Sequence, residues 1–394
     1  MDSTNPAAVG LDPERLRRVT RSIQTDIDGG LYDGAQLAVG RSGRLVLSEA
    51  LGFADRSSGR RLRNDDVLVA FSISKQLVVS VVLSFVEKGL LSLALPVAEV
   101  LPQFGVRGKG SITLFHLLTH TGGLLADVPA LPVEDLISLE RFTAFVCASA
   151  PEAPAGQRVL YSKMAAHSVM ASMLAAVDPG RRPFDVIMIE ELLRPLGLRS
   201  TQLGPPAGNR YVAPVVPRYR RPAGMFTAEA VSGSAQLMLH PGSQIPGAGY
   251  TTTAEDFYLF ADLLRGGGAR EGFRLLSPLT IELATRNHTG ELPNSLMDYA
   301  LGMRNWLPWP AYHGLGFFVR GEKLTPGPLP NLASARTYGG WGSGTSCFWV
   351  DPVNDVCFSL ITVGSLEDSD HLPRTQRLGD MVLAAVVQPP GGAA

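Results

Sequence analysis

The chain has 394 residues, of which 45% are hydrophobic and 18% are charged, and its formal net charge is −1. This material is enough for two or three domains or for one large discontinuous unit. Because the basic residues are scattered and balanced by acidic ones, the composition favours neither a nucleic-acid partner nor a polybasic membrane surface.

The N-terminal part predicts a helix followed by two strands. Apolar residues at helical spacing cover residues 11–27, with Asp12-Pro13 as an entry signal. Short apolar runs at 35–40 and 45–50 flank a turn-rich connection and predict a hairpin. From residue 72 to about 238 the pattern is mostly helical. The expected helices cover residues 76–88, 114–119, 139–148, 164–176 and 184–193.

Strand patterns return near the C-terminus. Pro, Gly and Arg increase between residues 204 and 233, which predicts a long surface loop, and a helix is expected at 253–264. The expected C-terminal strands and the closing helix cover residues 315–320, 335–338, 345–350, 356–363 and 374–387.

Strands occur at both ends of the chain and are separated by helices. The simplest arrangement is one antiparallel sheet to which both termini contribute strands. We therefore expect an α+β fold of two domains. Residues 1–71 and 239–394 would form the sheet domain with its flanking helices, and residues 72–238 an inserted, mainly helical domain. The active site would lie between them.

The sequence shows no pattern typical of export, membrane insertion or metal binding. Residues 1–6 are polar with no apolar signal segment behind them, and the apolar run at 78–86 is too short to cross a bilayer. Three cysteines are too few for a disulfide framework, and the seven histidines lack metal-ligand spacing. We expect a soluble, cytoplasmic protein without a metal, a cofactor or a membrane partner.

Ser72-Ile73-Ser74-Lys75, just before the helix at 76–88, is the candidate for nucleophilic chemistry. Positions three apart share a helix face, so the Ser72 hydroxyl and the Lys75 amine can lie side by side. A serine becomes a good nucleophile when a neighbour takes its proton, and a lysine among apolar side chains can lose its charge and act as that base. No other Ser-x-x-Lys occurs in the chain. The alternative is a chance pattern that marks only a helix start.

Two further motifs could complete a site. Tyr161-Ser162-Lys163 precedes the helix at 164–176. Tyr161 could shuttle a proton as phenolate or as phenol, because nearby positive charge favours the anion. The alternative is a buried tyrosine with one hydrogen bond. Trp341-Gly342-Ser343 lies in a glycine-rich stretch before the strand at 345–350, where a backbone N–H can complete an oxyanion hole with the N–H of Ser72. The alternative is an ordinary turn with Trp341 in the core.

Together these residues resemble the serine β-lactamase-like superfamily of penicillin-binding proteins, class C β-lactamases, family VIII carboxylesterases and related acyltransferases. The resemblance covers most of the chain in order, and the fold that it implies agrees with the layout above. Besides the three motifs, it rests on Leu117-Leu118-Thr119-His120-Thr121-Gly122-Gly123-Leu124, Pro195-Leu196-Gly197-Leu198 with Ser200-Thr201, Gly247-Ala248-Gly249-Tyr250 with residues 252–256, and Gly314-Leu315-Gly316-Phe317.

The resemblance implies roles for these residues. Ser72 would be the acylated nucleophile and Lys75 its activating base. Tyr161 would assist proton transfer to the leaving group and from the incoming acceptor. Trp341-Gly342-Ser343 would border the acyl site and bind substrate, whereas His120 would be structural.

Two departures from the family pattern bear on the substrate. Class C enzymes carry an asparagine two residues after the tyrosine, where this chain has Lys163. If the Lys163 amine points into the site, it would join the substrate-binding residues, disfavour charge on Lys75 and favour the phenolate of Tyr161. If it points to solvent, the orientation that we expect, it would do nothing there. β-Lactamases and peptidases carry Lys-Thr-Gly or His-Thr-Gly where this chain has Trp341-Gly342-Ser343. A neutral aromatic in place of a cation argues against anionic β-lactams and for neutral esters.

The expected function is a serine carboxylester hydrolase whose partner is a neutral small-molecule ester. The alternative is an acyltransferase that moves the acyl group from a donor to a small-molecule alcohol or amine in secondary metabolism, because both reactions use the same proton relay. A β-lactamase or D-peptidase and a catalytically dead binding module are the remaining options.

Overall fold

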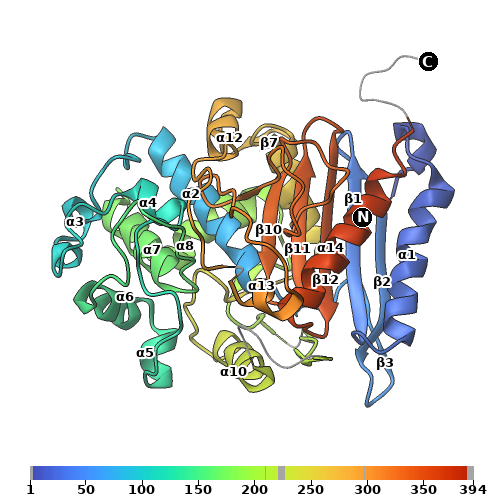
Figure 1. Cartoon of the computed structure of the whole chain (residues 1–394), viewed down its shortest axis with the longest axis horizontal. Helices are drawn as coiled ribbons and strands as arrows, with labels where there is room; N and C mark the ends of the chain where they lie inside the picture. The colour runs from blue at the N-terminus through green and yellow to red at the C-terminus, as the bar shows by residue number, and fades with distance from the viewer. Residues whose placement is uncertain (1–2, 209, 221–226, 297, 388–394) are drawn as a thin grey trace.

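A seven-stranded antiparallel sheet forms the centre of the molecule (Figure 1). The computed structural model describes residues 3–208, 210–220, 227–296 and 298–387. The strand order is β3-β2-β1-β12-β11-β10-β9, which confirms the sheet expected from both ends of the chain. The strands are β1 (Gly34–Arg41), β2 (Arg44–Asp55), β3 (Arg60–Arg61), β9 (Phe318–Val319), β10 (Tyr338–Gly342), β11 (Ser346–Asp351) and β12 (Val356–Val363).

The strand pair β1–β12 joins the two ends of the chain in the middle of this sheet. Its register is uninterrupted over eight residue pairs, and every residue of both strands is buried. Helices α1 (Pro13–Asp28) and α14 (Asp368–Leu383) cover one face, and α11 (Ala254–Arg265) covers the other. Burial on both faces explains why β12 is a continuous apolar run rather than an alternating one.

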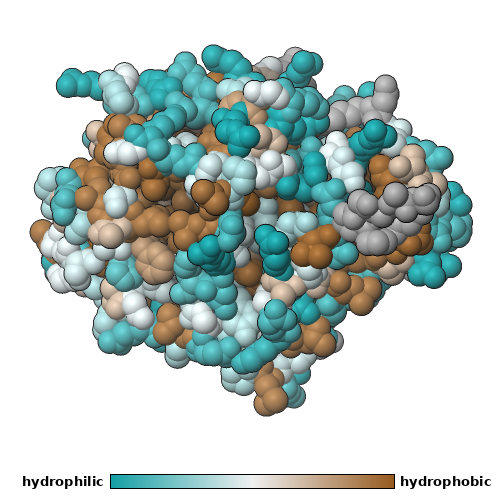
Figure 2. Space-filling model, turned by 90° about the horizontal axis from the view of Figure 1, so that it is seen from above, coloured by the Kyte–Doolittle hydropathy of each residue, from teal (hydrophilic) through white to brown (hydrophobic). Residues whose placement is uncertain are grey.

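Helices form the other half of the molecule, around α2 (Ser74–Glu87). Residues Ser74 through Phe85 of α2 are all buried, so α2 is a central helix that is enclosed on every side. The helices of this half lie to the left of the sheet in Figure 1, and Figure 2 shows apolar side chains gathered on the same side of the upper face. They are α3 (Val97–Val100), α4 (Leu114–Leu118), α5 (Val133–Ile137), α6 (Leu139–Ala148), α7 (Ala165–Val177), α8 (Phe184–Met188), α9 (Arg194–Leu196) and α10 (Ala228–Met238), with a π-helical turn at Ile189–Leu193.

Smaller elements connect the two halves. A three-stranded sheet with the order β4-β6-β5 is formed by β4 (Leu68–Val69), β5 (Gln202–Leu203) and β6 (Tyr250–Thr252). The remaining elements are the pair β7 (Ala269–Arg270) and β8 (Phe273–Arg274), and the helices α12 (Pro278–Ala284) and α13 (Asp298–Arg304). The division into 1–71 with 239–394 and 72–238 stays a prediction. No helix among the described residues has the length and apolar character needed to span a bilayer.

Several expected boundaries are wrong, among them those of the strand expected at 315–320, which covers only Phe318–Val319. The loop expected at 204–233, of which residues 209 and 221–226 lie outside the described part, ends in α10, which begins at Ala228. The strand expected at 335–338 begins only at Tyr338. The closing helix, expected at 374–387, covers Asp368–Leu383 and contains Pro373. Pro373 leaves the carbonyl of Ser369 without a helical donor, and this carbonyl accepts a hydrogen bond from Arg304 Nη2 at 2.8 Å instead, so the helix tolerates the proline.

Candidate active site

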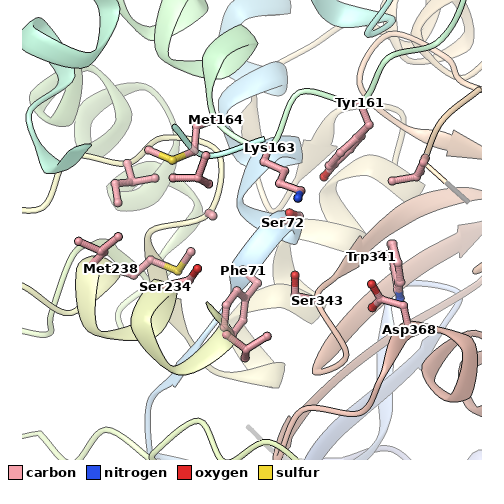
Figure 3. Close-up of a pocket in the computed structure, with 16 residues that line it drawn as sticks. Phe71, Ser72, Tyr161, Lys163, Met164, Ser234, Met238, Trp341, Ser343 and Asp368 are labelled. Atoms are coloured by element: carbon pink, nitrogen blue, oxygen red, sulfur yellow. The ribbon is translucent and has the colours of Figure 1, made fainter. Parts of the chain in front are cut away.

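Ser72 lies in the turn that leads from β4 into α2. This turn is a 3-10 helix, η2 (Phe71–Ile73), and Phe71 within it has a positive φ of 51°. A left-handed conformation costs a residue with a Cβ roughly 1–2 kcal/mol, and such strain is common at functional sites. Ser72 lines a hollow between the start of α2, the strand β10 and the helix α10 (Figure 3).

Lys75 lies directly behind this hydroxyl. Its Nζ is 3.1 Å from Ser72 Oγ and donates hydrogen bonds to the backbone carbonyls of Lys163 (3.0 Å) and Gly247 (2.9 Å). Only 1% of the residue is exposed, and burial lowers the pKa of Lys75 to about 7 because desolvation disfavours its charged form. A neutral amine has two N–H groups and one lone pair. The two carbonyls occupy the N–H groups, which leaves the lone pair for the Ser72 proton.

The rate of acylation is expected to rise with pH through about 7. The folded-state pKa of Lys75 lies near that value, so the neutral, proton-accepting form is the minor one below it and the major one above it. The ratio kcat/KM for a p-nitrophenyl ester, measured from about pH 5.5 to pH 9, should follow one titration near pH 7, since this ratio reports the free enzyme. A flat profile over that range would exclude Lys75 as the base.

Tyr161 reaches the same hollow from the segment before α7. Figure 3 shows its hydroxyl directed toward Ser72, and Lys75 Nζ lies 5.0 Å from the centre of its ring. The imidazole of His120 packs against that ring, with 4.6 Å between the ring centroids, and its Nδ1 accepts the N–H of Ser162. Burial raises the pKa of Tyr161, and the interaction with the Ser72 hydroxyl offsets only part of this rise. The resting form is therefore the neutral phenol, a proton donor, and not the phenolate that nearby positive charge would favour.

The third motif belongs to a strand, whereas we expected it to precede one. Strand β10 ends at Gly342, and Ser343 begins the turn to β11. A Cβ on Gly342 would come within 3.0 Å of the backbone N of Ser72 and would collide with Ser346 Oγ. Glycine is needed here because the strand and the nucleophile turn approach so closely. The N–H of Ser72 thus lies at the edge of β10, the type of arrangement from which oxyanion holes are built.

Lys163 borders the hollow, and the expectation that it points to solvent is wrong. Its side chain is 15% exposed and forms an ion pair with Asp127, which is 79% exposed. The exposed carboxylate balances the amine at the wall of the hollow. The lowered pKa of Lys75 is due to burial.

The hollow is a pocket of about 740 Å³, including its open mouth. Five of the candidate residues line this pocket: Ser72, Tyr161, Lys163, Trp341 and Ser343. Lys75 and Gly342 do not line the pocket themselves. The rest of the lining was not predicted from the sequence. It consists of Asp368 and of side chains, most of them apolar, that include Val128, Met164, Val231, Met238 and Ile245.

Helix α10 carries part of this missed lining. Its residues Val231, Ser234 and Met238 recur at i, i+3 and i+7, which is helical spacing. The signal was concealed because Ser232-Gly233-Ser234 is typical of a turn. In the part of the chain that the structure describes, no group of three or more His, Cys, Asp or Glu side chains is placed to hold a metal ion.

The sheet, the helical half and the pocket between them define the β-lactamase/transpeptidase-like class of fold. The chain belongs to the Beta-lactamase family, whose model matches residues 19–380.

Individual relatives agree with this assignment. The chain is 26% identical over 372 residues to Esterase/beta-lactamase LipL of Mycobacterium tuberculosis, covering 89% of this chain and 81% of that protein. A family VIII carboxylesterase superposes with a TM-score of 0.78 at 19% identity, covering 95% of this chain and 99% of that one. EstCE1, described as a hydrolase with promiscuous acyltransferase activity, superposes with a TM-score of 0.75 at 21% identity, covering 93% and 99%. At these identities the two structures show the fold alone, while the family and its esterase-named relatives support a hydrolase.

Proposed function

We propose that this chain is a carboxylester hydrolase that forms an acyl-enzyme on Ser72 and acts on small-molecule esters with an uncharged acyl group. The observation that carries the proposal is the buried Lys75 amine, which lies 3.1 Å from Ser72 Oγ with its two other hydrogen bonds directed to backbone carbonyls. The name of the relative LipL, an esterase/beta-lactamase, points in the same direction.

In this mechanism Lys75 takes the proton of Ser72 while Oγ attacks the ester carbonyl. The negative charge that develops on the carbonyl oxygen is stabilised by the N–H of Ser72 at the edge of β10. When the C–O bond breaks, the Tyr161 phenol gives its proton to the leaving alkoxide and regains one from the Lys75 ammonium. Water then enters, loses its proton along the same path in reverse, and releases the free acid.

The lining of the pocket supports uncharged acyl groups. Apolar side chains such as Met164 and Met238 form one side of it. Trp341 stands where related peptidases and β-lactamases carry a cation, and the amine of Lys163 is balanced by Asp127. An anionic β-lactam would therefore find little compensation for its lost hydration.

An acyltransferase is the second candidate. An acyl group held among apolar side chains meets little water, which favours attack by an alcohol or amine bound in the same pocket. The printed description of EstCE1 as a hydrolase with promiscuous acyltransferase activity fits this alternative. Tyr161 would then take the proton of the acceptor instead of that of water.

Incubation with p-nitrophenyl butyrate tests the proposal. We expect a burst of about one p-nitrophenolate per chain, a butyryl group on the Ser72 peptide by mass spectrometry, and butyrate release in buffer alone. Turnover that requires an added alcohol or amine would instead identify a transferase. The absence of burst, turnover and mass shift would indicate a binding module. Nitrocefin cleavage at a comparable rate would contradict the assignment of uncharged acyl groups.

Replacing Tyr161 with phenylalanine is expected to lower kcat by roughly 10²-fold or more, the usual loss for a general acid–base group. The substitution removes the hydroxyl but keeps the ring that packs on His120. The matched control is Tyr258→Phe, whose hydroxyl is buried in the core without a hydrogen-bond partner among the described residues. Steady-state rates with the same ester measure both variants, and near-normal turnover of Tyr161→Phe would reduce Tyr161 to a packing role.

A further inference from the structure

Ser72 separates the pocket into two unlike halves. Figure 3 shows Met164 and Met238 on one side of it, and Tyr161 and Trp341 on the other. In the proposed mechanism the Tyr161 phenol protonates the leaving oxygen. The alcohol part of an ester therefore belongs to the half formed by Tyr161 and Trp341, and the acyl chain belongs to the apolar half.

Asp368 brings a carboxylate into the alcohol half. It is the first residue of α14, is only 5% exposed, and lines the pocket. Figure 3 shows it beside Trp341, with its carboxylate oxygens directed toward the centre of the pocket. Its negative charge also acts on Tyr161, where it contributes to the raised pKa of the phenol. Because Asp368 and Tyr161 line the same pocket, the carboxylate can act on a charged group that is bound next to Tyr161.

A second hollow of about 690 Å³ adjoins this half of the pocket. Tyr161 and Lys163 line both hollows, and the second one carries the carboxylates of Asp127 and Asp298. Of the described charged side chains that line the two hollows, three are carboxylates and one, Lys163, is a cation. Lys163 and Asp127 balance each other, so the described side chains that line this route carry more acidic than basic groups, a distribution that favours cations over anions.

We propose that Asp368 determines specificity by selecting a positively charged ammonium group in the alcohol part of the ester, or in the acceptor that replaces it. This inference rests on the proposed function of the Ser72 site and names its substrate class: an uncharged, apolar acyl group carried by a basic alcohol. Trp341 adds an aromatic surface next to the carboxylate, and aromatic rings with a nearby negative charge bind quaternary ammonium groups well. An anionic alcohol would be repelled in the same place.

A pair of isosteric esters isolates the effect of charge. Butyrylthiocholine and 3,3-dimethylbutyl thiobutyrate share their acyl group and shape, and differ only in a quaternary nitrogen that is replaced by carbon. We expect kcat/KM, measured by thiol release, to be about tenfold or more higher for the cationic ester, the effect of one partly screened charge pair. A ratio of one or below would overturn the proposal.

The variant Asp368→Asn removes the charge and keeps the shape of the side chain. The preference for the cationic ester should then fall by about tenfold, toward equal rates. The matched control is Asp65→Asn, whose carboxylate is 72% exposed and paired with Arg63 at the surface, and it should keep the wild-type ratio. A preference that survives in Asp368→Asn would also overturn the proposal.

Binding of the two product-like alcohols provides a test without turnover or substitution. Choline should bind the wild-type protein about tenfold more tightly than 3,3-dimethylbutanol by calorimetry, and equal affinities would contradict the role of Asp368. If Asp368→Asn does not fold, this measurement on the wild-type protein still tests the preference for a cationic alcohol. The two proposals remain separable: failure of p-nitrophenyl butyrate to acylate Ser72 overturns the hydrolase, whereas cleavage of both thioesters at equal rates overturns only the specificity.

Discussion

The variant Lys75→Arg is expected to form no detectable acyl-enzyme and to lose esterase activity by roughly 10³-fold or more, as for removal of the base from a nucleophile–base pair. A guanidinium stays protonated at any accessible pH and so cannot take the proton of Ser72. The planar guanidinium also cannot take the place of the single Nζ, which donates to the backbone carbonyls of both Lys163 and Gly247. Burst amplitude with p-nitrophenyl butyrate and the intact mass of the protein measure the loss.

Lys88→Arg is the matched control for this variant. Lys88 follows the end of the same helix, is 46% exposed and pairs with Glu191. Arginine can keep such a surface ion pair, so activity and thermal midpoint should stay close to the wild type. A folded, active Lys75→Arg protein would remove Lys75 as the base.

The variant Ser72→Ala is expected to show no burst, no acyl adduct and no labelling by a fluorophosphonate. The hydroxyl is the only atom group removed, so binding of the ester should persist while covalent chemistry stops. The residual rate should lie roughly 10⁴-fold or more below that of the wild type, because a bound ester without its nucleophile keeps only the stabilisation that the rest of the site supplies.

Ser80→Ala tests whether loss of any buried serine of α2 has the same effect. The Ser80 hydroxyl donates to the carbonyl of Gln76 within the helix and does not line the pocket. This variant should keep the burst and the adduct. Labelling of Ser72→Ala on another residue would mean that the nucleophile lies elsewhere.

Elements with a strong local pattern could be predicted from the sequence. The strand at 356–363 and the helix at 139–148 were predicted with the bounds that the structure has, because a long apolar run and a regular helical spacing are properties of neighbouring residues. The short strands β4, β5 and β6 were missed. Each has two or three residues, and each forms only because a distant segment supplies its hydrogen bonds.

The same division applies to the candidate site. The spacing of Ser72 and Lys75 is a local property, and it was enough to predict that the hydroxyl and the amine lie side by side, as they do at 3.1 Å. The orientation of Lys163 was wrong because its partner, Asp127, lies 36 residues away in the chain. Asp368 was missed entirely, since nothing around it in the sequence connects it with Tyr161.

The sequence by itself determined the family pattern, the sheet from both ends and the serine–lysine pair, since each depends on residue types and short spacings. The tertiary structure decided the chemistry of that pair. The carbonyls that hold the Lys75 amine come from residues 88 and 172 positions away, and the burial that lowers its pKa comes from the whole fold. The charge of an amine depends on every group that displaces water around it, and only the folded chain brings those groups together.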